Sequence, residues 1–223
     1  MRKSNWLLEY QKDGVQSQHA EDGMLRKIFE VISPFNKWCV EFGAWDGKSM
    51  SNTWFLIKSM GWSGVEIEAN PNYFESLQTT YANNNVTCLN TRVEFEGENT
   101  LDRLLAKTDT PITFDLLSID IDGYDYQIWA SLRFYRPTVV VIEYNGLYGY
   151  EDHIQRVPAV TGQGSSLSSI TALAKSKGYE LIATCGRTLG VNAFYVRDDL
   201  FAEFEIEDNS ISKFITEDGM LIR

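Results

Sequence analysis

Carboxylates and glycines meet in a turn near the start of this 223-residue chain. The stretch VEFGAWDGKSMSNT, residues 40–53, combines the carboxylates Glu41 and Asp46 with Gly43 and a second glycine. A glycine here lets a ligand pass close to the backbone, and a helix that starts just beyond offers free N–H groups. Because Lys48 is the only cation of the stretch, a ligand with positive charge and hydroxyls fits better than a phosphate.

A further carboxylate, Glu68, ends the apolar stretch 63–69, two residues after Glu66. An ionised carboxylate has two acceptor oxygens, so it can accept hydrogen bonds from both hydroxyls of a ribose. We therefore predict that Glu68 binds a ribose.

Two later apolar stretches end in a group of acidic and amide side chains. SIDIDGYD supplies Asp120 and Asp122, and IEYN supplies Glu143 and Asn145. Side chains alternate along a strand, and adjacent parallel strands lie about 4.8 Å apart, so these oxygens are expected to converge. Such ligands suit Mg²⁺, Mn²⁺ or Ca²⁺. We predict a divalent-metal site made of Asp120, Asp122, Glu143 and Asn145.

The same residues allow two other interpretations. The cluster can hydrogen-bond an acceptor directly, with Asp120 as general base, or it can be structural, with Asp122 in a turn, Asp125 capping a helix and Asn145 in a second turn. His153 is a further candidate for catalytic base. Its alternative is an exposed loop histidine.

The elements around these turns must bring them to one edge of a sheet. Strand-helix alternation with nearly continuous apolar strands predicts an α/β fold with a mostly parallel sheet covered on both faces. Ligands of such sheets bind beyond the carboxyl ends of the strands, where strand order reverses. We expect helices over 21–32, 51–61, 71–82, 100–107, 125–132 and 166–178, and strands over 38–43, 63–69, 86–90, 114–121, 138–144, 179–185 and 193–197.

Composition excludes several partners. The net charge of −11 disfavours a surface for nucleic acid or an anionic membrane. No apolar run approaches the roughly 18 to 20 residues of a membrane span. Three widely spaced cysteines favour reduced thiols over a disulfide framework. We expect a cytoplasmic protein with a small-molecule acceptor, and its oligomeric state stays open.

Five motifs carry a resemblance to a known family. VEFGAWDGKSMSNT resembles the first motif of the Rossmann-like class of S-adenosylmethionine-dependent methyltransferases, and GVEIEANP resembles the second, with Glu68 in the ribose-binding place. LLSIDIDGYDYQIW, VVVIEYN and SQHAEDGMLRKIF are similar to FkbM-like methyltransferases, which are often associated with sugars and polysaccharides. The similarity covers roughly residues 15–198, whereas 1–14 and 199–223 match no motif.

The resemblance implies a seven-stranded sheet whose last strand is antiparallel. We predict one methyltransferase domain over 1–223, with a helical segment over 1–36, a Rossmann-like core over 37–198 and a C-terminal extension over 199–223. The resemblance also implies cofactor contacts, and it places the region around His19 near the cofactor, where the alternative is that Glu21 and Asp22 cap a helix. The predicted cofactor-binding residues are Glu41, Gly43, Ala44, Asp46, Asn52, Glu68, Asn90 and Asp120.

The expected activity is transfer of a methyl group from S-adenosylmethionine to a hydroxyl of a sugar or nucleotide-sugar, assisted by Mg²⁺ or Mn²⁺. A non-catalytic module that binds S-adenosylmethionine is the alternative from another class. A dinucleotide-binding oxidoreductase is a further alternative, but it needs the spacing GxGxxG. Here Trp45 and Asp46 stand where its pyrophosphate needs space.

Overall fold

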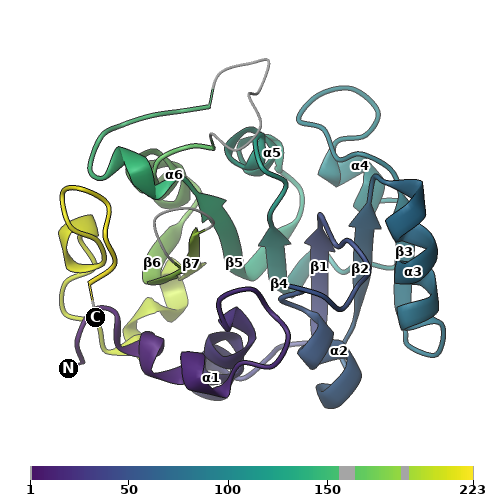
Figure 1. Cartoon of the computed structure of the whole chain (residues 1–223), viewed down its shortest axis with the longest axis horizontal. Coiled ribbons are helices and arrows are strands. Elements are labelled where there is room, and N and C mark those ends of the chain that lie inside the picture. The colour runs from purple at the N-terminus through teal and green to yellow at the C-terminus, as the bar shows by residue number, and fades with distance from the viewer. Residues whose placement is uncertain (1, 156–163, 187–190, 223) are drawn as a thin grey trace.

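A seven-stranded sheet forms the centre of the molecule in the computed structural model, which describes residues 2–155, 164–186 and 191–222 (Figure 1). The strand order is β3-β2-β1-β4-β5-β7-β6. The strands are β1 (Trp38–Phe42), β2 (Ser63–Glu68), β3 (Val86–Asn90), β4 (Thr113–Ile119), β5 (Arg136–Tyr144), β6 (Tyr179–Cys185) and β7 (Val191–Arg197).

All strands but one run in the same direction. The pairs from β3 across to β5 are parallel, and β7 is antiparallel to both of its neighbours. This confirms the predicted sheet with its antiparallel last strand. The chain builds outward from β1 to β3 and then returns to β4 on the other side of β1. The strand order therefore reverses between β1 and β4, where a ligand is expected.

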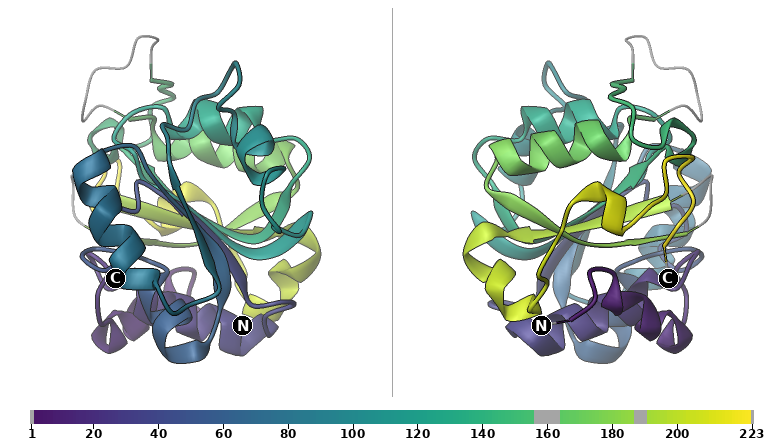
Figure 2. Two further views of the ribbon diagram at one scale, coloured as in Figure 1. Left: turned by 90° about the vertical axis from the view of Figure 1, so that its right-hand side faces the viewer. Right: turned by 90° about the vertical axis from the view of Figure 1, so that its left-hand side faces the viewer.

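Helices cover both faces of the sheet, as the two side views show (Figure 2). α1, α2 and α3 pack with the 3-10 helices η1 and η3 on one face, and α4, α5 and α6 pack on the other. Each face has its own buried apolar cluster. The helical elements of the first face are η1 (Trp6–Asp13), α1 (Glu21–Ile32), α2 (Trp54–Met60), α3 (Pro71–Tyr81) and η3 (Asp198–Phe204), and those of the second are α4 (Leu101–Leu105), α5 (Asp125–Ser131) and α6 (Leu167–Ser176).

The inner strands are apolar on both sides because both of their faces are covered. In β4, Leu116 belongs to one buried cluster and its neighbour Leu117 to the other. Both side chains are fully buried. The alternation of side chains along a strand thus gives each layer of helices its own apolar surface.

Helix α2 begins three residues later than predicted. The helix was expected from residue 51, but it starts at Trp54. Ser51, Asn52 and Thr53 instead donate hydrogen bonds to the carboxylate of Glu41 in β1. A buried carboxylate needs donors, so this segment is held against the sheet.

The two ends of the chain pack together. Arg2 forms a β-bridge with Ile206, and the Asn5 side chain donates a hydrogen bond to the carbonyl of Ile222. Phe214 and Ile215 are buried in the cluster beneath α5 and α6. Residues 199–222, which match no motif, therefore contribute to the core. Among the described residues, no helix is long and apolar enough to cross a membrane.

Candidate functional site

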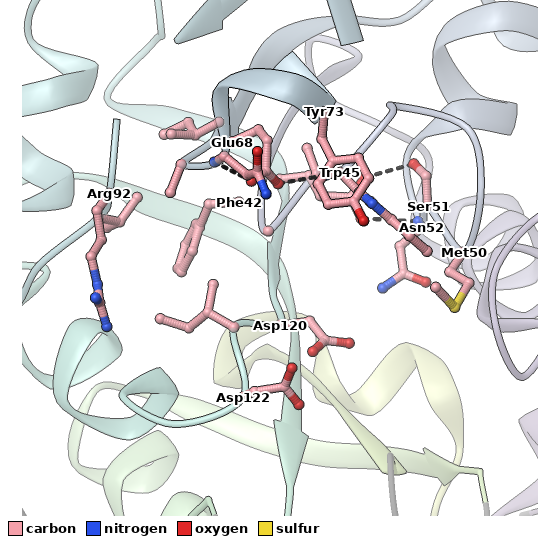
Figure 3. Close-up of a pocket in the computed structure, with 18 of the residues that line it drawn as sticks. Phe42, Trp45, Met50, Ser51, Asn52, Glu68, Tyr73, Arg92, Asp120 and Asp122 are labelled. Atoms are coloured by element: carbon pink, nitrogen blue, oxygen red, sulfur yellow. Dashed lines mark hydrogen bonds between the residues drawn. The ribbon is translucent and has the colours of Figure 1, made fainter. Parts of the chain in front are cut away.

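A cavity of about 850 Å³ opens at the carboxyl edge of the sheet (Figure 3). Residues at or just beyond the carboxyl ends of β1 to β5 line it, so it spans the reversal of strand order between β1 and β4. Figure 3 shows Glu68 at one end and the carboxylates of Asp120 and Asp122 at the other. The lining residues fall in the segments 41–45, 49–52, 67–70, 91–93 and 120–122, together with Gln18, Tyr73 and Glu143.

The turn after β1 passes directly against the end of β4. Gly43 has a φ of +77°, and a Cβ atom there would lie 2.0 Å from the carbonyl oxygen of Asp120. The backbone N–H groups of Gly43 and Ala44 donate to the carbonyl of Ile67 in β2. The glycine is therefore required by the contact between two turns, in addition to any role beside a ligand.

Glu41 holds the segment 51–53, which forms one side of the cavity, through hydrogen bonds. Its side chain is 5% exposed, and its Oε1 accepts from the backbone N–H of Asn52 and the hydroxyl of Ser118. Its Oε2 accepts from Ser51 and Thr53. The Asn52 amide in turn donates to Ser118. These contacts hold Ser51 and Asn52 at the cavity, so Glu41 is arranged to act on a ligand through this segment.

Glu68 joins the ends of β1 and β2. Its Oε1 accepts from the backbone N–H of Asn70 at 2.6 Å, and its Oε2 accepts from that of Trp45 at 2.9 Å. An ionised carboxylate has about four acceptor positions. Each oxygen of Glu68 therefore retains a free position on a carboxylate that lines the cavity.

Three of the four predicted metal ligands meet at the far end. Oxygen atoms of Asp120, Asp122 and Glu143 lie within 4.8 Å of one another. The register of β4 and β5 pairs Ile119 with Ile142, which sets Asp120 beside Glu143. No lysine or arginine of the described ranges forms an ion pair with these carboxylates. The cluster therefore lacks a counter-charge within that part of the chain.

The surroundings of the cluster favour protonation. Burial raises the pKa of Asp120 well above its usual range, and the neighbouring Glu143 raises it further. Burial, then Asp125 and Asp122, raise the pKa of Glu143 to about 8. Carboxylates that share a small volume hold a proton or bind a cation.

Asp125 has a structural role, but it is not the predicted helix cap: it is the first residue of α5, whose N-cap is Tyr124 with no side-chain cap hydrogen bond. It is buried, and it accepts hydrogen bonds from the backbone N–H groups of Ile121 and Gly123. These contacts fix the loop that carries Asp122, whose φ of +57° lies in the left-handed region. A non-glycine residue rarely adopts this conformation without support from its surroundings.

The four other predicted residues do not line the cavity. Asp46 accepts from the N–H groups of Lys48 and Ser49 within its own turn, and the Asn90 amide donates to the carbonyl of Glu68. Asn145 accepts from the N–H of Leu147 and begins a 3-10 helix, η2 (Gly146–Tyr148).

His153 is the fourth predicted residue that does not line the cavity. Its ring stacks on Tyr148 with 3.9 Å between centroids. Direct ligand roles for Asp46, Asn90, Asn145 and His153 stay predictions that this geometry does not support.

Several lining residues were not identified from the sequence. Tyr73 packs edge-on against Trp45, and its position in the first turn of the helix after β2 could have indicated it. Arg92 and Met50 carry no such signal. Gln18 lines the cavity, which agrees with the expectation that the segment around His19 lies near the cofactor.

Glu21 and Asp22, which begin α1, hold the preceding loop. Asp22 accepts from the N–H groups of Val15 and Gln16, and Glu21 accepts from that of His19. Glu21 also accepts from the amide of Asn192 in β7. The pair therefore holds the loop before α1, and neither side chain makes a cap hydrogen bond of the kind that the alternative interpretation expected.

Comparison with solved structures supports the fold. A S-adenosylmethionine-dependent methyltransferase from Clostridium acetobutylicum superposes with a TM-score of 0.50 and 8% identity, over 83% of this chain and 94% of that chain. A methyltransferase from Geobacter sulfurreducens has a TM-score of 0.50 and 11% identity, over 88% of this chain and 90% of that chain. The fold is thus the Rossmann-like fold of these methyltransferases.

Sequence comparison adds a match to a family model. Residues 97–181 match the family model described as Methyltransferase FkbM domain. This segment contains the whole acidic cluster, and the match confirms the resemblance that the motifs indicated. No curated protein matches the chain. The family match and the fold together give the class: the protein is a methyltransferase with the fold of the S-adenosylmethionine-dependent enzymes.

Proposed function

We propose that the protein transfers a methyl group from S-adenosylmethionine to a hydroxyl of a small polar acceptor of the sugar or nucleotide-sugar class. One observation carries the proposal. One cavity has the carboxylate of Glu68 at one end and a cluster of carboxylates around Asp120 at the other. A donor and an acceptor can therefore meet inside it.

The cavity suits the cofactor by its charge and its hydrogen-bond acceptors. S-adenosylmethionine would supply a methyl group activated by a sulfonium. The free acceptor positions of Glu68 suit two ribose hydroxyls. Among the described residues, the lining contains Glu41, Glu68 and Asp120 but only one basic side chain, Arg92, which favours a ligand with a net positive charge over a dinucleotide.

The acidic cluster suits a divalent cation. Asp120, Asp122 and Glu143 provide hard oxygen ligands within 4.8 Å of one another, as Mg²⁺ or Mn²⁺ requires. A bound ion would stabilise the acceptor in its alkoxide form and orient it. Mg²⁺ sites commonly keep several exchangeable positions, so an acceptor with two adjacent hydroxyls fits this cluster.

The residues would act on the acceptor as follows. The acceptor oxygen attacks the methyl carbon in line, a C–O bond forms, and the electron pair of the breaking C–S bond goes to sulfur. The hydroxyl proton must leave, and Asp120 or Glu143 can accept it when ionised. Holding the oxygen against the methyl group is the other requirement, because orientation lowers the barrier by several kcal/mol.

The proposed class of acceptor rests on the net charge of the protein and on its resemblance to FkbM-like methyltransferases. A net charge of −11 disfavours RNA or DNA, whose phosphates need clustered lysine and arginine. The sugar assignment rests on the FkbM resemblance and on the fit of a diol to the acidic cluster.

Methyl-labelled S-adenosylmethionine and a panel of sugars, nucleotide-sugars, peptides and phenols test the proposal. We expect label on a hydroxyl of a sugar-containing acceptor, stimulation by Mg²⁺ or Mn²⁺, and at least a hundredfold loss of rate in Asp120→Asn. Asn145→Ala is the matched control, because its side chain lies outside the cavity. Binding of cofactor without label transfer to any acceptor would favour the non-catalytic module.

A further inference from the structure

A second carboxyl group, Glu66, lies in the interior directly beside Glu41. The two residues are paired in the register of β1 and β2. Glu66 has no exposed surface, and Glu41 is 5% exposed. Glu66 does not line the cavity, so the proposed reaction leaves its presence unexplained.

If Glu41 and Glu66 were both ionised, there would be too few hydrogen atoms to make all the hydrogen bonds around the pair. The hydroxyl oxygen of Thr53 lies 2.8 Å from Oε2 of Glu41 and 2.9 Å from Oε1 of Glu66. A hydroxyl has one proton and can donate to only one of them. The other contact needs a proton that comes from a carboxyl group.

Glu66 is the member that can carry this proton. Glu41 already accepts from Ser51, Ser118 and the N–H of Asn52. The second oxygen of Glu66 is buried and has no partner among the described residues. An ionised carboxylate in that position would pay a large desolvation cost. A neutral acid that donates from Oε1 to Thr53 leaves only a carbonyl oxygen unpaired.

Within the described part of the chain, the titratable groups that face Glu66 include no lysine, arginine or histidine. They are Glu41 and Cys39 from β1, Cys88 from β3 and Tyr81 from α3. Burial and then the charge of Glu41 raise the pKa of Glu66 well above its usual range. The hydrogen-bond geometry and the surrounding charges therefore both indicate that Glu66 is a neutral acid.

We propose that Glu66 is a positioning residue: as a neutral carboxylic acid it donates a hydrogen bond to Thr53 and so orders the segment 51–53. Thr53 then donates to Glu41, and Glu41 holds Ser51 and Asn52 against the cavity. The claim that the segment 51–53 contacts a cofactor rests on the proposed function. The claim that Glu66 is protonated does not depend on it.

The first experiment measures stability against pH and needs no cofactor. Urea unfolding of the wild type is compared with Glu66→Gln, whose amide can donate to Thr53 but cannot titrate. An unfolded glutamate ionises near pH 4.3, whereas the folded protein keeps the proton. The folded state thus binds one more proton, and stability falls as pH rises.

Above about pH 5 the wild type should lose up to tenfold in folding equilibrium per pH unit relative to Glu66→Gln. The exposed Glu75 of α3, changed to glutamine, controls for loss of one carboxylate and should run parallel to the wild type. A difference between wild type and Glu66→Gln that does not vary from pH 5 to 8 overturns the proposal.

The second experiment measures binding of S-adenosylhomocysteine at pH 7. Glu66→Gln should bind within about twofold of the wild type, and Glu66→Leu, which has similar volume but no donor, should bind about tenfold more weakly. Tenfold weaker binding by folded Glu66→Gln would show that the ionised form is needed and would overturn the proposal. Absence of binding to the wild type contradicts the proposed function instead, and the pH experiment still decides the state of Glu66.

Discussion

Gly43 lies so close to Asp120 that a Cβ atom on the glycine would come within 2.0 Å of the aspartate's carbonyl oxygen. The contact joins the turn after β1, which precedes the Glu41-bound segment, to the end of β4, which carries the acidic cluster. The two halves of the proposed site are therefore aligned by backbone packing before any ligand enters.

Gly43→Ala should destabilise the fold more than an alanine at a comparable glycine. Gly61 also has a positive φ, of +69°, but a Cβ atom on it would have no neighbour within 4 Å. Gly61→Ala should cost about 1 to 2 kcal/mol from the left-handed conformation alone. Gly43→Ala should cost about 2 kcal/mol more, because the backbone of β4 must move. Urea unfolding measures both values, and equal costs would show that the β4 contact is unimportant.

Divalent ions should stabilise the wild type through the acidic cluster. At a hundredfold excess over Kd, Mg²⁺ or Mn²⁺ should add about 2.7 kcal/mol, seen as a rise in Tm. Asp120→Asn and Glu143→Gln should lose this response, although each should be more stable than the wild type without metal, since the carboxylates repel one another. An undiminished response in both variants would place the ion elsewhere.

Asn145→Ala tests the fourth predicted ligand. Its side chain accepts from Leu147 N–H in a turn, so the variant should lose about 1 kcal/mol of stability and keep the full metal response. A lost metal response in Asn145→Ala would restore the residue as a ligand.

Methyl transfer without added metal should rise with pH. Burial raises the pKa of Glu143 to about 8, so this acid holds its proton at neutral pH and its basic form accumulates as pH increases. The rate should climb toward a plateau above about pH 8, and saturating Mg²⁺ should shift the rise to lower pH because the ion favours the ionised form. A flat profile in the metal-free wild type, or an unchanged profile in Glu143→Gln, would remove this group from the proton transfer.

The position of the acidic cluster could be predicted because it depends on regular structure. Alternation along β4 and β5 and their adjacency bring Asp120 and Glu143 together, and the register confirms this. Asn145 follows the same alternation, but β5 ends at Tyr144 and the amide is used in the next turn. A strand end is set by local hydrogen bonds that the apolar pattern does not encode.

Hydrogen bonds between buried polar side chains of different elements could not be predicted from the sequence either. The delayed start of α2 depends on Glu41, which lies ten or more residues before its partners Ser51 and Thr53. Glu66 was likewise assigned no role from the sequence, although it is fully buried and contacts Thr53. Period-two patterning gives the face of a residue but not the partners it will find there.

Titration calorimetry with S-adenosylhomocysteine, on the wild type and on Glu68→Ala, tests the central claim most directly. Wild type should bind one equivalent, and Glu68→Ala should bind about 10- to 100-fold more weakly, since each hydrogen bond to a charged group contributes about 1.5 to 3 kcal/mol. Glu75→Ala, an exposed charge on the neighbouring helix, should bind as the wild type does. No heat of binding to the folded wild type, or unaltered affinity in Glu68→Ala, would contradict the assignment of this cavity to S-adenosylmethionine.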